Sequence, residues 1–233
     1  MTQVSTQGLV NLLAGTELGG RTDQIYKVNF AVPNKLLGKE TGGNSSGFSF
    51  GIVQLDIANN SQAKKAYAEI LADALSAGRI DQATCDRLEK YNGCKRPDLD
   101  KALAASYRQD RTLLTDTVFT AASAHAIVDR YTADYVERSL LGAVNNFLSA
   151  VESKWGPNTV FAESNPDCYT AITAMASISN RTGGLRGSTR HFENLASSPD
   201  TLSVVKARYD SVLGDHWHLI EVGARLYKEG GVF

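Results

Sequence analysis

Apolar residues recur at helical spacing along most of the chain. The stretch 62–77 (QAKKAYAEILADALSA) carries its apolar residues on one face, with Asn59-Asn60-Ser61 offering N-caps before it and Gly78 placed to end it. Asp81 is placed to cap a second predicted helix at 82–91. The pattern favours a mainly helical protein.

The longest periodic region runs from 112 to 154, without proline and with a single glycine, Gly142. Its apolar residues fit two successive faces, and a helix of this length is uncommon in a globular domain, so we expect a break within 130–133 and two core helices. Further helices are predicted, from apolar spacing and turn residues, at 3–14, 33–39, 98–107, 166–179, 188–197, 201–213 and 216–228.

One segment departs from helical spacing. Residues 45–55 alternate loosely between apolar and polar and contain aromatic and β-branched residues, which indicates a short strand or hairpin edge. No linker, repeat or low-complexity tract divides the 233 residues. We therefore predict an α+β, predominantly helical fold with a small β element, in one domain spanning 1–233.

The charge balance limits the kinds of partner. A net charge of -1 gives no general attraction to nucleic acid or to an anionic membrane, and no nucleic-acid motif is present. The first residues, MTQVSTQGLVNLLAG, lack the basic start and apolar core of a signal peptide, and no apolar run is long enough to cross a bilayer. We expect synthesis in the cytoplasm without a signal peptide, no membrane insertion and no nucleic-acid partner.

The cysteines and histidines do not predict a metal site. Cys85, Cys94 and Cys168 lack zinc-ligand spacing, and they are either reduced thiols or, for the first two, a bridge formed after export. The histidines lie too far apart or, at 216 and 218, at the wrong spacing to share one helix face. No metal and no cofactor is therefore expected.

The candidate chemistry gathers in the stretch from Glu40 to Asp56, which reads ETGGNSSGFSFGIVQLD. Glu40 ends a predicted helix and precedes a glycine-rich turn, so the helix can hold its carboxyl rigid while the carboxyl faces a groove, as general acid catalysis requires. The alternative is an ordinary solvent-facing glutamate at a helix end.

This stretch resembles known active sites. A Glu, a glycine-rich turn and then F-G-x-x-Q-x-D resembles goose-type lysozymes and, more loosely, soluble lytic transglycosylases, and Ser49-Phe50-Gly51-Ile52 is similar to the S/T-x-G-I of phage lysozymes and pesticin-type bacteriocins. The resemblance implies a lysozyme-like fold with Glu40 as the general acid. It also implies that Gln54 lies near the sugar and that Ser49 can hold the attacking water.

Two further residues of the stretch have open roles. Asp56 either orients a water, which makes the enzyme inverting if the two carboxyls are about 6.5–9.5 Å apart, or holds the loop by accepting backbone N–H bonds. Gly51 allows the backbone or a sugar to approach closely, and we place it with Gln54 among the substrate-binding residues.

A second cluster, ISNRTGGLRGS at 178–188, resembles the N-R-G segment at the far wall of phage-type lysozyme clefts. Asn180 could bond a sugar or peptide-stem group, and Arg181, Arg186 or Arg190 could pair with muramyl or stem carboxylates. The alternative is an ordinary loop between helices.

Together these features predict a peptidoglycan hydrolase that cleaves between N-acetylmuramic acid and N-acetylglucosamine, with bacterial cell-wall peptidoglycan as its partner. The alternatives are a lytic transglycosylase on the same substrate and a noncatalytic glycan-binding module on a lysozyme scaffold. Acting in the periplasm or cell wall would require export by a holin or a specialised secretion apparatus. That setting fits a phage endolysin or an antibacterial toxin, the latter with an immunity protein.

Overall fold

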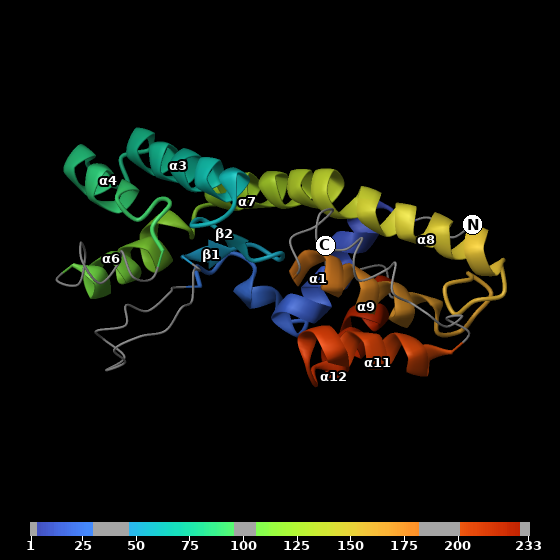
Figure 1. Cartoon of the computed structure of the whole chain (residues 1–233). Coiled ribbons are helices and arrows are strands. Elements are labelled where there is room, and N and C mark those ends of the chain that lie inside the picture. The colour runs from blue at the N-terminus through green and yellow to red at the C-terminus, as the bar shows by residue number, and fades with distance from the viewer. Residues whose placement is uncertain (1–3, 30–46, 96–105, 182–200, 229–233) are drawn as a thin grey trace. The chain divides into compact units, whose positions relative to one another are not determined.

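The structure, a computed structural model, describes residues 4–29, 47–95, 106–181 and 201–228. Over these residues the chain is predominantly helical and carries one two-stranded antiparallel sheet (Figure 1). The predicted helical majority and the small β element are thus confirmed. The finer prediction, a lysozyme-like arrangement, stays a prediction.

The chain divides into two compact units. Unit 1 comprises residues 1–22 and 133–233, and unit 2 comprises residues 23–132. One boundary falls between Thr132 and Ala133, at the segment where the sequence predicts a helix break. The prediction of a single catalytic domain over 1–233 stays a prediction.

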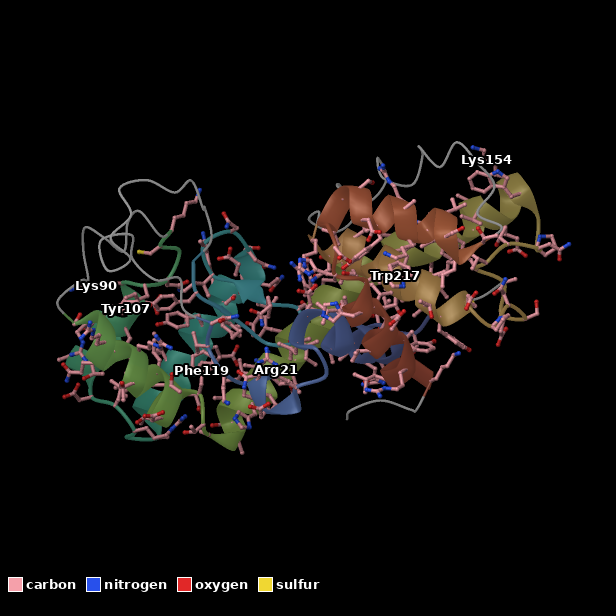
Figure 2. All side chains as sticks on the ribbon, turned by 90° about the horizontal axis from the view of Figure 1, so that it is seen from below. Arg21, Lys90, Tyr107, Phe119, Lys154 and Trp217 are labelled. Atoms are coloured by element: carbon pink, nitrogen blue, oxygen red, sulfur yellow. The ribbon has the colours of Figure 1, made fainter. Side chains whose placement is uncertain are left out.

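Unit 1 is built around α1 (Thr6–Leu18), which packs against α12 (Trp217–Lys228) and α9 (Cys168–Arg181) (Figure 1). In the same unit α9 also contacts α8 (Gly142–Trp155) and α11 (Leu202–Leu213). Trp217, labelled in Figure 2, is buried at the start of α12 and meets the ring of Tyr209 edge-on. The predicted helices at 166–179, 201–213 and 216–228 are confirmed to within about two residues.

Two glycines bring two helices of unit 1 into close contact. A Cβ added to Gly15 of α1 would lie 2.2 Å from the Cα of Gly223 in α12. Glycine normally weakens a helix interior, but here the missing side chains let the two backbones touch. The predicted end of this helix at residue 14 is wrong for that reason, because packing against α12 outweighs the propensity of Gly15.

Both ends of α1 are capped. The hydroxyl of Ser5 accepts a hydrogen bond from the backbone N–H of Gly8, and Gly19 ends the helix in the left-handed region at φ +60°. Ser5 is thus the N-cap, and the helix runs on past residue 14, its predicted end, to Leu18. As a result Glu17 lies in the last turn of a well-packed helix.

Unit 2 contains α3 (Ser61–Ser76), α4 (Gln82–Glu89) and the hairpin of β1 (Ser49–Phe50) and β2 (Leu55–Asp56). The predicted helices at 62–77 and 82–91 and the cap at Asp81 are confirmed, and of the caps offered by residues 59–61 the structure uses Asn60. Aromatic side chains fill much of the core: Phe48, Phe50, Tyr67, Tyr91, Tyr107 and Phe119. Of these, Tyr107 and Phe119 are labelled in Figure 2.

A charged residue is buried in this core. Asp110, in α6 (Tyr107–Leu113), accepts a hydrogen bond of 2.8 Å from Arg87 Nε and another of 2.8 Å from the Tyr91 hydroxyl. A buried carboxylate is tolerated only with such partners, so this cluster ties α4 and the residues after it to α6.

The long periodic region is helical but not in the predicted way. The helix α7 (Ala122–Tyr135) runs straight through the expected break, and the helical path is interrupted earlier, at residues 119–121. Two segments widen into π-helix, η2 (Leu114–Val118) and η3 (Val136–Leu141). The predicted break within 130–133 is therefore wrong. The change of apolar face that suggested a break has another source, because the wider turn of a π-helix shifts which residues face the core.

Three predicted helices, at 33–39, 188–197 and most of 98–107, lie outside the described residues. Across the described part of the chain, none of the helices has the length and apolar character needed to span a membrane.

Candidate functional site

The predicted active-site stretch is described only from Gly47 onward. Glu40 lies outside the described residues, so its role as general acid stays a prediction. Arg186 and Arg190, predicted to pair with substrate carboxylates, also lie outside them.

The described half of the stretch forms the hairpin. Ser49 pairs with Asp56 and Phe50 with Leu55, with residues 51–54 forming the turn. On its other side Ser49 exchanges two backbone hydrogen bonds with Asn29, of 2.7 and 2.9 Å. The predicted short hairpin is confirmed, and it has a third extended segment beside it.

The structure brings Ser49 and Gln54 together on this hairpin. The Ser49 hydroxyl donates to Gln54 Oε1 over 3.1 Å, and Asn29 Nδ2 donates to the same oxygen over 2.9 Å. Gln54 Nε2 in turn donates to the carbonyl oxygen of Gly51 over 3.1 Å. Ser49 and Gln54 are half-buried and Asn29 is exposed, so a polar cluster of hydroxyl and amide groups reaches the surface.

Gly51 is explained by packing inside unit 2. Its N–H donates to the carbonyl of Ile25, and its φ of +74° favours glycine. An added Cβ would lie 3.0 Å from Thr132 Oγ1 and 3.3 Å from Val128 Cγ1, both on α7. The predicted close approach exists, and its described partner is protein; a sugar at Gly51 stays a prediction.

The side chain of Asp56 holds the loop that leaves the hairpin. Its Oδ1 accepts from the backbone N–H of Gly47 at 2.9 Å and of Ala58 at 2.8 Å, and its Oδ2 accepts from Asn59 Nδ2 at 2.9 Å. Of the two roles that the sequence left open, these contacts match the loop-holding one. The water-orienting role requires Glu40 as the second carboxyl, and Glu40 lies outside the described residues, so that role stays a prediction.

The second predicted cluster is occupied by a carboxylate. Arg181 forks onto Glu17, with Nε 3.1 Å from Oε1 and a terminal nitrogen 3.0 Å from Oε2, and Asn180 Nδ2 lies 3.2 Å from Oε1. The Glu17 side chain is 5% exposed, whereas that of Arg181 is 47% exposed. Asn180 and Arg181 thus bind the same carboxylate of their own unit, and their predicted contacts with a substrate stay a prediction.

Two tyrosines lie in the electrostatic environment of this ion pair. Burial raises the pKa of the Tyr135 hydroxyl, and the negative charge of Glu17 adds to the effect. Burial also raises the pKa of Tyr209, with a hydrogen bond from Ser177 and the charge of Arg181 acting in the opposite direction. A carboxylate, a guanidinium, an amide and two neutral phenols therefore share one region of unit 1.

Glu17 and Asn29 were missed by the sequence analysis. Glu17 has the features sought in Glu40: it ends a helix, precedes a Gly-Gly turn and is withdrawn from water. The signal is the sequence TELGG, which follows the predicted helix at 3–14. Asn29 gave no signal, because its pairing with β1 joins residues that are 20 positions apart in sequence.

None of the three cysteines forms a disulfide; in particular, Cys85 and Cys94 are not bridged. The thiol of Cys94 donates to the carbonyl of Lys90, and the thiol of Cys168 donates to that of Phe161. Over the described ranges, no group of three or more His, Cys, Asp or Glu side chains is placed to hold a metal ion.

Comparison of the chain with protein-family models, with curated proteins and with solved structures finds no match in any of the three.

Proposed function

We propose that this chain is a peptidoglycan hydrolase of the muramidase type, cleaving the bond between N-acetylmuramic acid and N-acetylglucosamine. The observation that carries the proposal is Glu17: a carboxylate at the end of a packed helix, 5% exposed, held by the Asn180–Arg181 pair that the sequence placed in a glycan-binding wall. The helical fold with its small hairpin and the Ser49–Gln54 contact add support.

Glycoside hydrolysis needs a carboxyl that protonates the leaving oxygen, and its position must be fixed against the scissile bond. Glu17 meets the requirement of rigidity, because α1 packs against both α12 and α9. As described it is ion-paired, so to hold a proton it must first lose Arg181. The half-exposed guanidinium can turn to water or to a substrate carboxylate, which makes that exchange feasible.

Two carboxylates therefore compete for the role of acid: Glu40, from the resemblance, and Glu17, from the geometry. The test is to make Glu17→Gln and Glu40→Gln separately and to measure release of reducing ends from purified cell walls. The variant that removes the acid should lose about 10²- to 10⁴-fold in rate. Glu221→Gln, an exposed glutamate on α12, is the matched control and should keep full activity.

Each result has one meaning. Loss in only one variant assigns the acid to that residue, and loss in both indicates two carboxyls that work together, as glycosidases commonly use. Full activity in both variants contradicts the proposal. Mass spectrometry of the products separates hydrolysis from lytic transglycosylation, since only the latter leaves anhydromuramyl ends. Binding to cell walls without turnover by the unmutated protein would favour a noncatalytic glycan-binding module.

A further inference from the structure

The amide of Gln54 is fixed in orientation by its neighbours. The carbonyl oxygen of Gly51 can only accept a hydrogen bond, so the Gln54 atom 3.1 Å from it has to be the amide nitrogen. The amide oxygen then faces the other way, where Asn29 Nδ2 and the Ser49 hydroxyl both donate to it. Three partners on two sides leave the amide one orientation.

This arrangement decides what Gln54 can offer a ligand. A glutamine amide has two N–H donors and an oxygen with two acceptor positions. Both acceptor positions are filled, by Asn29 and Ser49, and one donor is used on Gly51. The second N–H on Nε2 remains, so Gln54 presents a donor and no acceptor.

The backbone at this residue is strained. Gln54 has φ +51°, and among the described residues it is the one non-glycine residue with a positive φ. A side chain in that region costs free energy relative to glycine, and such outliers gather at ligand-binding sites. The turn of the hairpin thus keeps a glutamine where glycine would fit more easily, which points to a use for the side chain.

We propose that Asn29 is a positioning residue that locks the Gln54 amide, so that Gln54 donates its remaining N–H to an acceptor oxygen of the ligand. On a glycan of the proposed substrate class we assign that oxygen to the carbonyl of an acetamido group, because an amide oxygen is a stronger acceptor than a hydroxyl or ring oxygen. Deacetylation removes that acceptor and leaves a cationic amine in its place. The inference deepens the proposed function and rests on its choice of glycan. It assigns to the hairpin the discrimination between N-acetylated and deacetylated sugars.

The experiment is calorimetric titration of the full chain with the tetramer of N-acetylglucosamine and with the tetramer of glucosamine, each checked by mass spectrometry to be intact afterwards. The unmutated protein should bind the N-acetylated tetramer more tightly. Asn29→Asp keeps the shape and the backbone pairing but removes the N–H donor, and Asn29→Ala removes it without adding charge. Either variant should weaken binding of the N-acetylated tetramer by about 3- to 10-fold.

A double-mutant cycle separates positioning from a general structural effect. Because Asn29 acts through Gln54, the double variant Asn29→Ala with Gln54→Ala should bind no more weakly than Gln54→Ala alone. Gln54→Gly relieves the positive φ, so it should melt at the same temperature as the parent or higher while losing affinity. Gln82→Ala, which removes an exposed amide from α4, is the control and should change neither property.

Three outcomes overturn the inference: no preference for the N-acetylated tetramer, unchanged affinity in both Asn29 variants, or additive losses in the double variant. They are distinguishable from failure of the proposed function. If binding follows the expected pattern but cell walls are not cleaved, the proposed hydrolase activity is wrong and the proposed recognition by Gln54 stands. If the Asn29 variants still cleave cell walls and bind the N-acetylated tetramer with unchanged affinity, only the proposed role of Asn29 and Gln54 is wrong.

Discussion

Both units contain a carboxylate that is withdrawn from water, Asp110 in unit 2 and Glu17 in unit 1, and the two are held differently. Asp110 in unit 2 has a side chain 1% exposed, with Arg87 at 33% exposed and the buried Tyr91 hydroxyl as partners. Glu17 in unit 1 is 5% exposed, but Arg181 is 47% exposed and lies at the last residue of α9. The carboxylates are alike in burial and differ in how easily their partners can leave.

On the proposed function, that difference separates a structural role for Asp110 from a chemical role for Glu17. Asp110 links α6 to α4 and to Tyr91, and losing it would leave a partly buried guanidinium and a buried hydroxyl without an acceptor. Glu17 joins α1 to the end of α9, and its half-exposed partner can be hydrated when the pair opens. Burial alone would not have told the two apart.

The largest expected effect on stability follows from Asp110. Asp110→Ala should lower the free energy of unfolding by about 3 kcal/mol, because it leaves the partly buried Arg87 guanidinium uncompensated and the buried Tyr91 hydroxyl without its acceptor. Urea denaturation of the full chain measures the change. Asp86→Ala, which removes an exposed carboxylate of α4 bonded to Gln82, is the control and should stay within about 0.5 kcal/mol of the parent. A small loss of stability in Asp110→Ala would contradict the structural role assigned to Asp110 and its contrast with Glu17.

Asp56 extends the comparison to a carboxylate that is bonded to backbone. Asp56→Ala should cost about 1–3 kcal/mol, because the N–H groups of Gly47 and Ala58 lose their acceptor inside the unit. Asp56→Asn keeps one oxygen for those groups and should lose less stability. Cell-wall cleavage measured well below the melting temperature should be nearly unchanged in Asp56→Asn; a large loss there would instead support the water-orienting role.

Glu17 should give a smaller stability effect than either aspartate. Glu17→Gln keeps one acceptor for Asn180 and leaves Arg181 free to turn to water, so the expected cost is about 1 kcal/mol or less. Thermal unfolding of this variant beside Glu221→Gln measures it. A cost comparable with that of Asp110→Ala would mean that Glu17 is mainly structural, and would weaken its candidacy as the acid.

The smallest expected effect on stability appears only at alkaline pH. It comes from Tyr26, whose hydroxyl donates a hydrogen bond to the exposed carboxylate of Asp129. Burial, the hydrogen bond to Asp129 and the charge of that residue raise the pKa of Tyr26 to about 12. The unfolded chain loses this proton near pH 10, earlier than the folded chain, so the stabilisation is complete below about pH 10 and is lost between about 10 and 12. Ultraviolet titration of the parent against Tyr26→Phe isolates the group, and Asp129→Asn should bring its pKa closer to 10.

Helices with strong local signals were predicted well. Asn60 and Asp81 mark helix starts by their own chemistry, and the apolar spacing of 62–77 and 201–213 needs no tertiary information. Gly15 shows the limit. Glycine locally argues for a helix end, and only the distant Gly223 explains why the helix continues. The π-helical turns escaped prediction for a related reason, since the extra residue is invisible to a count based on 3.6 residues per turn.

The candidate site was predicted in part. Ser49 with Gln54, and Asn180 with Arg181, were each correctly grouped because their members are near in sequence. Their partners Asn29 and Glu17 come from distant segments, joined by sheet pairing in one case and by helix packing in the other. The roles predicted for Gln54 and Asp56 were less constrained than the structure makes them, because a side chain's remaining hydrogen-bonding capacity depends on the bonds already made.

The contact between Gly15 and Gly223 also sets an order of events during synthesis. At ~5–20 residues per second, the roughly 200 residues between these glycines take about 10–40 seconds to be made. For that time α1 has no α12 to cover it, whereas unit 2 is one continuous stretch of chain that is already complete. The helix α1 is therefore buried by α12 long after it is made, and Glu17 acquires its partners Asn180 and Arg181 only once α9 has been synthesised.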